Sequence, residues 1–178
     1  MTSPSGNPAN ANRRASRSIE ERLQELEDER EIRELLIEYA QRLDARDHKG
    51  YAALFTRDGR WSGKLGDYQG REAIEAMLLE AFGPTPEGFT NTNNFHLMSN
   101  FVIRIDGDRA TAQSRITYFE RSPEARPVAM LAGRYEDELV REDGRWRFKH
   151  RHVIGEIPTG EEIKAREEAE KKAREKNT

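Results

Sequence analysis

The chain has 178 residues, of which 35% are hydrophobic and 35% are charged, and this length fits a single domain. It contains no cysteine, which excludes disulfides, thiolate metal sites, iron–sulfur clusters and a cysteine nucleophile. A net charge of −3, with basic and acidic residues interspersed, argues against nucleic acid as the main partner. No apolar run approaches the roughly 18 residues that cross a bilayer, so we expect a soluble, cytoplasmic protein without a membrane partner.

Composition divides the chain into three parts. Residues 1–17 contain no acid and almost no large apolar side chain, which predicts a disordered N-terminal tail. Residues 161–178 have Ile163 as their one large apolar residue and carry opposite charges at helical spacing, which predicts a solvated, charged helical extension. Residues 18–160 are the predicted folded domain.

The first half of this domain has the pattern of helices. Ser18 and Glu21 fit a capping box, so a helix is expected to begin there and to run to about Asp44. Its apolar residues recur with a period of 3.6: Ile32, Leu35, Leu36, Tyr39, Ala40 and Leu43. A short helical segment over residues 51–55, capped by Asp47, should precede a turn at residues 57–59. A third helix is expected over residues 70–79, before the breakers at residues 83–86.

The second half has the pattern of strands. Residues 96–105, 110–120, 128–140 and 145–154 are strand-like, and Asp-Gly pairs at 106–107 and 143–144 mark two tight hairpins. These strands should form an antiparallel meander. Helices followed by strands in one short chain indicate an α+β domain, with helices covering one face of a curved sheet.

Several local strings, in this order, resemble the SnoaL-like branch of the nuclear transport factor 2-like (NTF2-like) superfamily. The resemblance covers roughly residues 25–156, and the strings are Tyr39-x4-Asp44, Tyr51-Ala-Ala-Leu-Phe55-x2-Asp58-Gly59, His96-x3-Asn100, Asp106-Gly107-Asp108-x-Ala110, Gly133-x-Tyr135 and Asp143-Gly144-x-Trp146-x-Phe148. It implies a cone-shaped α+β barrel of cystatin-like fold, with the long N-terminal helix in the concavity of a curved antiparallel sheet and a deep pocket at one end. It also implies a homo-oligomer, a dimer or a trimer, built on the outer face of the sheet.

Within the superfamily, the pattern is most similar to cofactor-free lyases: bile acid 7α-dehydratase, scytalone dehydratase and hexachlorocyclohexane dehydrochlorinase. The resemblance implies four catalytic residues, Tyr39, Asp44, His96 and Arg151. The strand over residues 110–120 departs from the dehydratase pattern, because it lacks the expected acid and offers Gln113, Ser114, Thr117 and Tyr118 instead. The leaving group and the substrate therefore stay open.

Each of these residues also has a structural interpretation. Asp44 near a helix C-terminus is opposed by the helix dipole, which a hydrogen bond from an imidazole would offset, or else it caps the helix or faces water. His96 is either a general base or a structural histidine at a strand start. The sequence alternation places His96 out of phase with Phe101, and Arg151 out of phase with Trp146. The catalytic interpretation therefore requires a bulge in each strand.

Tyr39 is a candidate donor to a substrate oxygen or an aromatic of the buried face, and Arg151 is a candidate leaving-group partner or one of several cations on its strand. Six residues are candidate substrate-binding side chains, and Phe95 and Leu97 extend this apolar set: Phe55, Trp61, Tyr68, Met98, Tyr118 and Met130. His150 and His152 share a strand face, but no third ligand is evident, so neither a metal nor another cofactor is expected.

The sequence therefore predicts a cofactor-independent lyase, most similar to a dehydratase, acting on a cyclic, mostly apolar, hydroxylated small molecule such as a steroid- or polyketide-like ring. An isomerase or polyketide cyclase would use the same histidine–aspartate dyad and differ in whether water leaves. A non-catalytic binding or assembly subunit is the third possibility. Such a subunit should have a pocket filled by side chains and His96 far from Asp44.

Overall fold

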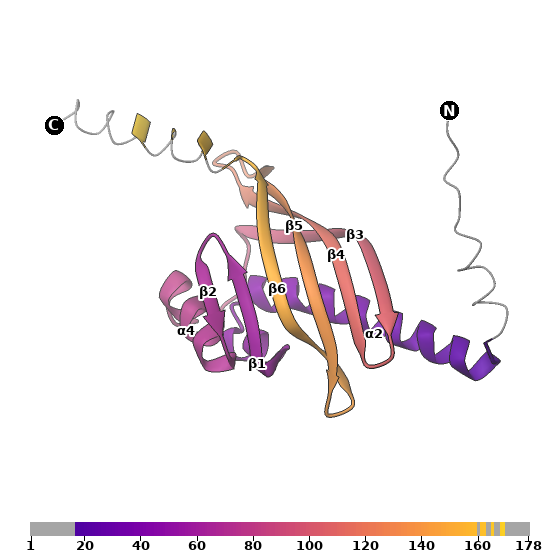
Figure 1. The fold of residues 1–178 in the computed structure, drawn as a ribbon. Helices are drawn as coiled ribbons and strands as arrows, with labels where there is room; N and C mark the ends of the chain where they lie inside the picture. Colours follow the sequence, from indigo (N-terminus) through magenta and orange to yellow (C-terminus); the bar gives the residue numbers. More distant parts are fainter. Residues whose placement is uncertain (1–16, 160, 163–164, 166–167, 170–178) are drawn as a thin grey trace, which may run out of the picture.

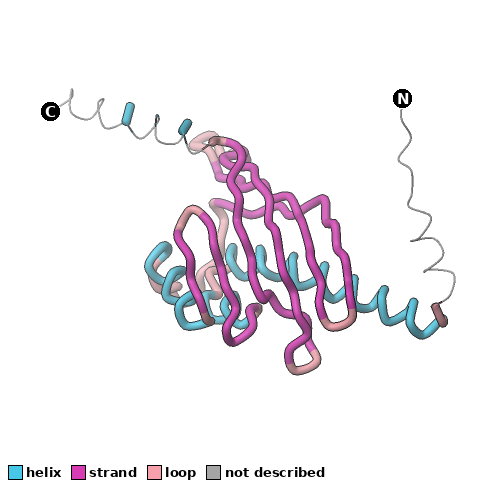
Figure 2. The backbone as a smooth tube through the Cα atoms, viewed as in Figure 1, coloured by secondary structure: helices cyan, strands magenta, loops and turns pink. Residues whose placement is uncertain are grey.

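The computed structural model describes residues 17–159, 161–162, 165 and 168–169. In these ranges the chain forms helices α2 (Ile19–Asp44), α3 (His48–Ala53) and α4 (Arg71–Phe82), and strands β1 (Phe55–Gly63), β2 (Gly66–Gln69), β3 (Asn94–Asp106), β4 (Arg109–Arg121), β5 (Pro127–Glu142) and β6 (Arg145–Ile157). The strands make one curved sheet in the order β2-β1-β6-β5-β4-β3, and the helices lie against one face of it (Figures 1 and 2). This confirms the predicted α+β architecture. The predicted tail and most of the charged C-terminal extension lie outside the described residues.

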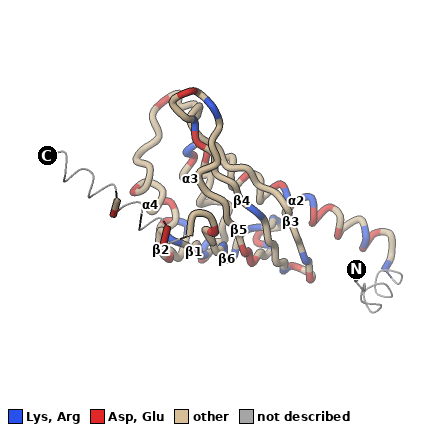
Figure 3. Tube along the Cα trace, turned by 90° about the horizontal axis from the view of Figure 1, so that it is seen from above, with Lys and Arg blue, Asp and Glu red and all other residues tan. Residues whose placement is uncertain are grey.

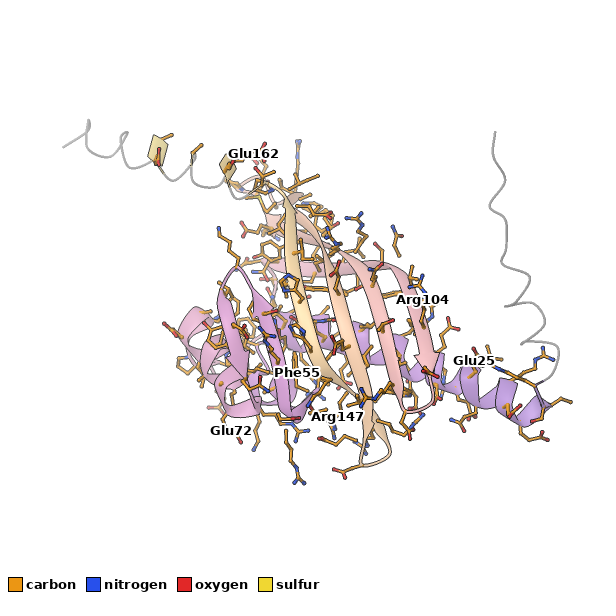
Figure 4. All side chains as sticks on the ribbon, viewed as in Figure 1. Glu25, Phe55, Glu72, Arg104, Arg147 and Glu162 are labelled. Carbon is orange, nitrogen blue, oxygen red and sulfur yellow. The ribbon has the colours of Figure 1, made fainter. Side chains whose placement is uncertain are left out.

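Helix α2 begins as the capping box predicts. The Ser18 hydroxyl accepts a hydrogen bond from the Glu21 backbone at 3.1 Å, and the Glu21 carboxylate accepts one from the Ser18 backbone at 2.8 Å. The first turns, which include Glu25, extend beyond the sheet edge at β3 and carry charges of both signs (Figures 3 and 4). The later turns bury their apolar stripe against the sheet. The C-terminal end of α2 is therefore the part that delivers side chains to the interior.

The two predicted bulges are present. In β3, Ser99 pairs with Arg115 but Val102 pairs with Gln113, and Asn100 has a φ of 52°, so β3 carries one extra residue there. His96 and Phe101 thus face the same side of the sheet, as their burial shows.

In β6, Phe148 pairs with Leu139 while His150 pairs with Glu138, which leaves Lys149 as the extra residue. Arg151 consequently shares the inner face with Trp146 and Phe148, and all three are buried. Both irregularities that the alternation required are confirmed.

The prediction of a turn at residues 57–59 was wrong. These residues belong to β1, which pairs with β6 in parallel, so the sheet is mixed rather than wholly antiparallel. Phe55 pairs with Phe148 and Arg60 with His150, so four residues of β1 bulge out opposite one residue of β6. A Cβ atom on Gly59 would lie 3.0 Å from the Phe148 carbonyl oxygen, so glycine here permits close strand contact. The β1–β2 hairpin itself was not predicted.

Gly133 in β5 allows a second close contact between strands. A Cβ atom at this position would lie 2.3 Å from the Ile154 carbonyl oxygen, whereas one on its pairing partner Gly155 would have no heavy atom within 4 Å. We expect Gly133→Ala to lower the free energy of unfolding by about 1–3 kcal/mol, because the strands must separate to relieve the overlap. Gly155→Ala is the matched control and should change it by less than about 0.5 kcal/mol. Urea unfolding measures both, and equal losses would contradict this reading.

Within the described residues, no helix combines the length and the apolar character that a membrane crossing requires.

Candidate active site

Asp44, the last residue of α2, is in contact with His96, near the start of β3. The imidazole Nδ1 lies 2.6 Å from the carboxylate Oδ1, and the His96 backbone N–H donates to Oδ2 at 3.0 Å. The side chain of Asn91 donates to the Asp44 backbone carbonyl at 2.8 Å. These contacts tie the end of the helix to the first residues of the strand. The Asp44 and His96 side chains are 21% and 18% exposed, so solvent reaches the pair only in part.

The carboxylate fixes the tautomer of His96. A carboxylate only accepts hydrogen bonds, so Nδ1 carries the hydrogen, and in the neutral imidazole the lone pair is then on Nε2. Among residues 17–159, no group forms a hydrogen bond with Nε2. The dipole at this end of α2 disfavours a carboxylate, and the two N–H donors of His96 offset that cost. Asp47 has the separate role predicted for it, because its side chain caps α3.

His96 lines a cavity of about 660 Å³ between the helices and the concave face of the sheet. The lining residues come from all three described helices, the β1–β2 turn and the strands, and most are apolar or aromatic. No Asp or Glu is among them. They are Tyr39, Leu43, Arg46, Tyr51, Trp61, Lys64, Leu65, Met77, Leu78, Phe82, Asn91, Asn94, His96, Ile116, Tyr118, Leu131, Tyr135, Val153, Ile154, Gly155 and Pro158. This volume suits a small ring system.

Two tyrosine hydroxyls meet at the base of the cavity. The Tyr51 hydroxyl is hydrogen-bonded to that of Tyr39, and the Trp61 indole N–H donates to the Tyr39 oxygen at 3.1 Å. The Tyr51 hydroxyl uses its hydrogen in the bond to Tyr39, and the Trp61 indole can only donate. The hydrogen of the Tyr39 hydroxyl is therefore left for a further acceptor. Burial raises the pKa of Tyr51 well above its usual value, so this group stays a neutral donor. The three side chains therefore offer a ligand one hydrogen-bond donor.

Tyr118 lies beside the dyad. Its ring centroid is 4.8 Å from that of His96, and both side chains line the cavity. Burial, together with a hydrogen bond and the negative charge from Glu120, raises the pKa of Tyr118 to about 12. The phenol is therefore protonated at neutral pH, and its single O–H hydrogen is donated to the Glu120 carboxylate.

Arg151 lies outside the set of residues that line the cavity. Its side chain is fully buried, and Nε and Nη2 each donate to the Asp137 carboxylate at 2.7 Å. The guanidinium carbon is 3.9 Å from the ring centroid of Tyr39 and 4.2 Å from that of Tyr135, and both rings line the cavity. Burial opposes the charge, but the carboxylate of Asp137 more than offsets this and raises the pKa of Arg151. This position supports the aromatic side chains from behind and gives no direct contact with a leaving group.

The candidate substrate-binding residues divide into two groups. Trp61 and Tyr118 line the cavity. The other four do not: Phe55 is buried in the core, Met98 packs against the core, Tyr68 packs against Trp61, and Met130 is exposed on β5. Phe95 and Leu97 are also exposed, and they have the opposite parity from His96 in β3.

His150 and His152 lie at the pairing of β6 with β1. Nε2 of His150 and Nδ1 of His152 are each 2.8 Å from the Ser62 hydroxyl. Burial and the neighbouring charge of Arg60 lower the pKa of His150. In the part of the chain that the structure describes, no three His, Asp or Glu side chains are grouped to hold a metal ion.

Comparisons with known proteins identify the family to which this chain is similar. The model of the SnoaL-like domain matches residues 24–152. The uncharacterized protein Rv2910c of Mycobacterium tuberculosis is 32% identical over 132 residues, covering 71% of this chain and 84% of the relative. A candidate scytalone dehydratase from Novosphingobium aromaticivorans has a TM-score of 0.61 and 29% identity, covering 75% of this chain and 87% of the other. ActVI-ORFA from Streptomyces coelicolor has a TM-score of 0.60 and 26% identity, covering 71% of this chain and 95% of the other.

A further solved structure shows the fold alone. An NTF2-like protein with a cystatin-like fold, also from Novosphingobium aromaticivorans, has a TM-score of 0.66 at 23% identity and covers 80% of this chain and 90% of the other. The family model covers α2 from residue 24 onward and the sheet up to residue 152 of β6, and most of the cavity lining lies within this range. This chain belongs to the SnoaL-like domain family of the NTF2-like superfamily.

Proposed function

We propose that this protein is a cofactor-independent lyase of the dehydratase type, acting on a cyclic, mostly apolar, hydroxylated small molecule. The observation that carries the proposal is the 2.6 Å contact between Asp44 and His96 at the wall of a largely apolar cavity. An imidazole with a fixed tautomer and a free lone pair is suited to general-base catalysis. The similarity to a candidate scytalone dehydratase supports the same chemistry.

The residues suggest a short reaction sequence. His96 Nε2 removes a proton from a carbon next to a carbonyl, and the electron pair moves to the carbonyl oxygen as an enolate. The Tyr39–Tyr51 pair donates a hydrogen bond to that oxygen, and Asp44 stabilises the imidazolium. The enolate then expels the β-hydroxyl group, which takes the proton back from Nε2 and leaves as water. The product gains one carbon–carbon double bond, and the enzyme returns to its starting state.

One imidazole serves both proton transfers in this scheme. Among the described residues, no carboxyl group lines the cavity, and the guanidinium of Arg151 is bound to Asp137 behind the aromatic side chains. A single proton carrier requires that the proton and the hydroxyl leave from the same face of the ring. We therefore propose a syn elimination, in which Arg151 acts as a positioning residue for Tyr39 and Tyr135.

Two alternative reactions of the same dyad also need no second acid. If the proton on Nε2 returns to a different carbon, the same dyad catalyses an isomerisation, and if the enolate attacks a carbonyl of the same molecule, it catalyses a cyclisation. The assembly-subunit alternative is less well supported, because such a subunit should have a filled pocket and a separated dyad. The open cavity and the 2.6 Å contact point the other way.

A substrate panel in heavy water tests the proposal. Cyclic β-hydroxyketones of two to four rings are incubated with the protein in D₂O and followed by mass spectrometry. We expect at least one to lose about 18 mass units, the mass of one water. Deuterium uptake next to the carbonyl without this loss would support the isomerase or cyclase alternative. If every compound that binds shows no water loss and no deuterium uptake, general-base catalysis is contradicted.

A further inference from the structure

Among the residues that the structure describes, the two charged side chains that line the cavity are both cations. Arg46 follows α2 and is half-buried, and Lys64 lies exposed in the β1–β2 turn. Two further lining residues, Leu65 beside Lys64 and Phe82 beside Arg46, are 55% and 42% exposed, so the cavity meets solvent next to each cation. We propose that the cavity takes an amphipathic acid, with its apolar rings inside and a carboxylate at this opening, held by Arg46 and Lys64. This inference assigns a negative charge to the ligand of the cavity. It rests on the proposed function only where it assumes that the reacting carbon of this ligand lies at His96.

Arg46 is held in place but has no acidic partner. Its guanidinium carbon lies 4.9 Å from the ring centroid of Phe89, and Nη1 is 3.5 Å from the Phe82 carbonyl oxygen. These contacts leave most of its five N–H donors free. Among the described residues, no carboxylate lies within ion-pair distance of Arg46.

The acids beside Arg46 in the sequence are already bound. Both oxygens of Asp44 accept hydrogen bonds from His96. The carboxylate of Asp47 caps α3 and forms an ion pair with Arg42. A guanidinium that stacks on a ring while its fork remains unpaired is arranged to bind a planar anion such as a carboxylate.

Lys64 shows the same arrangement on the other side of the opening. The acid nearest to it in the β1–β2 hairpin, Asp67, binds the guanidinium of Arg60 through both oxygens. In the described part of the chain, Lys64 has no ion-pair partner. The hairpin thus presents an ammonium group at the cavity with its neighbouring carboxylate already neutralised.

The charge of the opening contrasts with that of the whole protein. The chain carries 33 acidic and 30 basic residues, yet the part of it that the structure describes lines the cavity with two cations and no acid. A local positive region on an acidic protein attracts an anionic ligand to that region rather than to the general surface. The positive charge of Arg46 also acts on Tyr118, which lies beside His96. It lowers the pKa of Tyr118 and so opposes part of the rise that burial and Glu120 cause.

A matched pair of probes tests this inference without turnover. The probes 2-naphthylacetate and 2-(2-naphthyl)ethanol share the ring and the length of the arm but differ in charge. Calorimetric titration of the full chain at neutral pH should give about tenfold tighter binding of the acid, as expected for one charge-assisted contact. Raising sodium chloride from about 50 mM to about 500 mM should weaken binding of the acid and leave binding of the alcohol unchanged.

The variants assign the effect to the opening. Arg46→Gln and Lys64→Gln should each weaken binding of the acid about three- to tenfold, with binding of the alcohol unchanged. Arg104→Gln is the control, because it removes an exposed cation from β3, outside the cavity lining (Figure 4). Equal affinity for the two probes, binding of neither, or equal losses for both probes in Arg46→Gln would overturn the inference. Asp44→Asn should keep the preference for the acid, so failure of the proposed catalysis is distinguishable from failure of this site.

Discussion

Asp44→Asn is expected to lower kcat by about 10²- to 10⁴-fold on any substrate that the protein turns over. Asparagine is the same size as aspartate, and its amide oxygen can still accept from the His96 backbone. Its NH₂ group, however, donates to Nδ1 and moves the imidazole hydrogen to Nε2, so the lone pair no longer faces the cavity. His96→Gln removes the base itself and should cause a loss of similar size.

Asp47→Asn is the matched control for this experiment. It makes the same chemical change three residues away, and asparagine remains a good helix cap for α3. Its kcat should stay within about twofold of the wild-type value, since the exposed ion pair with Arg42 contributes little. Single-turnover rates and urea unfolding are measured on all variants. A well-folded Asp44→Asn protein with the wild-type rate would remove the dyad from the mechanism.

Asp137→Ala should produce the largest loss of stability, about 3–5 kcal/mol in the free energy of unfolding. The substitution leaves the guanidinium of Arg151 without a counter-ion at a site where both side chains are 0% exposed. A double variant, Asp137→Leu with Arg151→Met, removes both charges together and should recover most of this loss, because no unpaired charge stays buried.

The control for Asp137→Ala is an ion pair of similar geometry at the protein surface. Arg60 and Asp67 also form two hydrogen bonds, but their side chains are 46% and 53% exposed. Asp67→Ala should therefore cost less than about 1 kcal/mol. Urea unfolding of the three variants gives the comparison. A loss in Asp137→Ala no larger than that in Asp67→Ala would contradict the burial of the charged pair.

Local patterns predicted most of the elements in this fold. The capping box at Ser18 set the start of α2, and the two Asp-Gly pairs set the hairpins of the meander. The break in alternation between His96 and Phe101 indicated a bulge that is present at Asn100. Each of these signals lies within a few neighbouring residues, where side-chain period and turn chemistry act.

The β1–β2 hairpin escaped prediction because its signals are not local. Gly59 has the appearance of a turn residue, but its small size serves the parallel contact with Phe148, which lies far away in the sequence. Strand β2 is short and largely exposed, so it lacks the alternation that marks a half-buried strand.

The candidate site was predictable in part. Asp44 and His96 are 52 positions apart, and only the family resemblance connected them before the structure placed them in contact. Asp137 was missed although the sequence carries a signal for it. It shares its parity with the buried Tyr135 and Leu139, and an acid on an inward face requires a cation as its partner. Tyr51 had no comparable signal, since its hydrogen bond to Tyr39 depends on how α3 packs.

The extra residue at Asn100 has a consequence for how the sequence of such a domain can vary. The direction of the imidazole depends on how many residues separate it from the hydrophobic end of β3, and not on which residues they are. Loss of one codon in this short stretch would keep almost every side chain but turn the histidine towards solvent. Substitutions here are therefore easier to accommodate than changes in length.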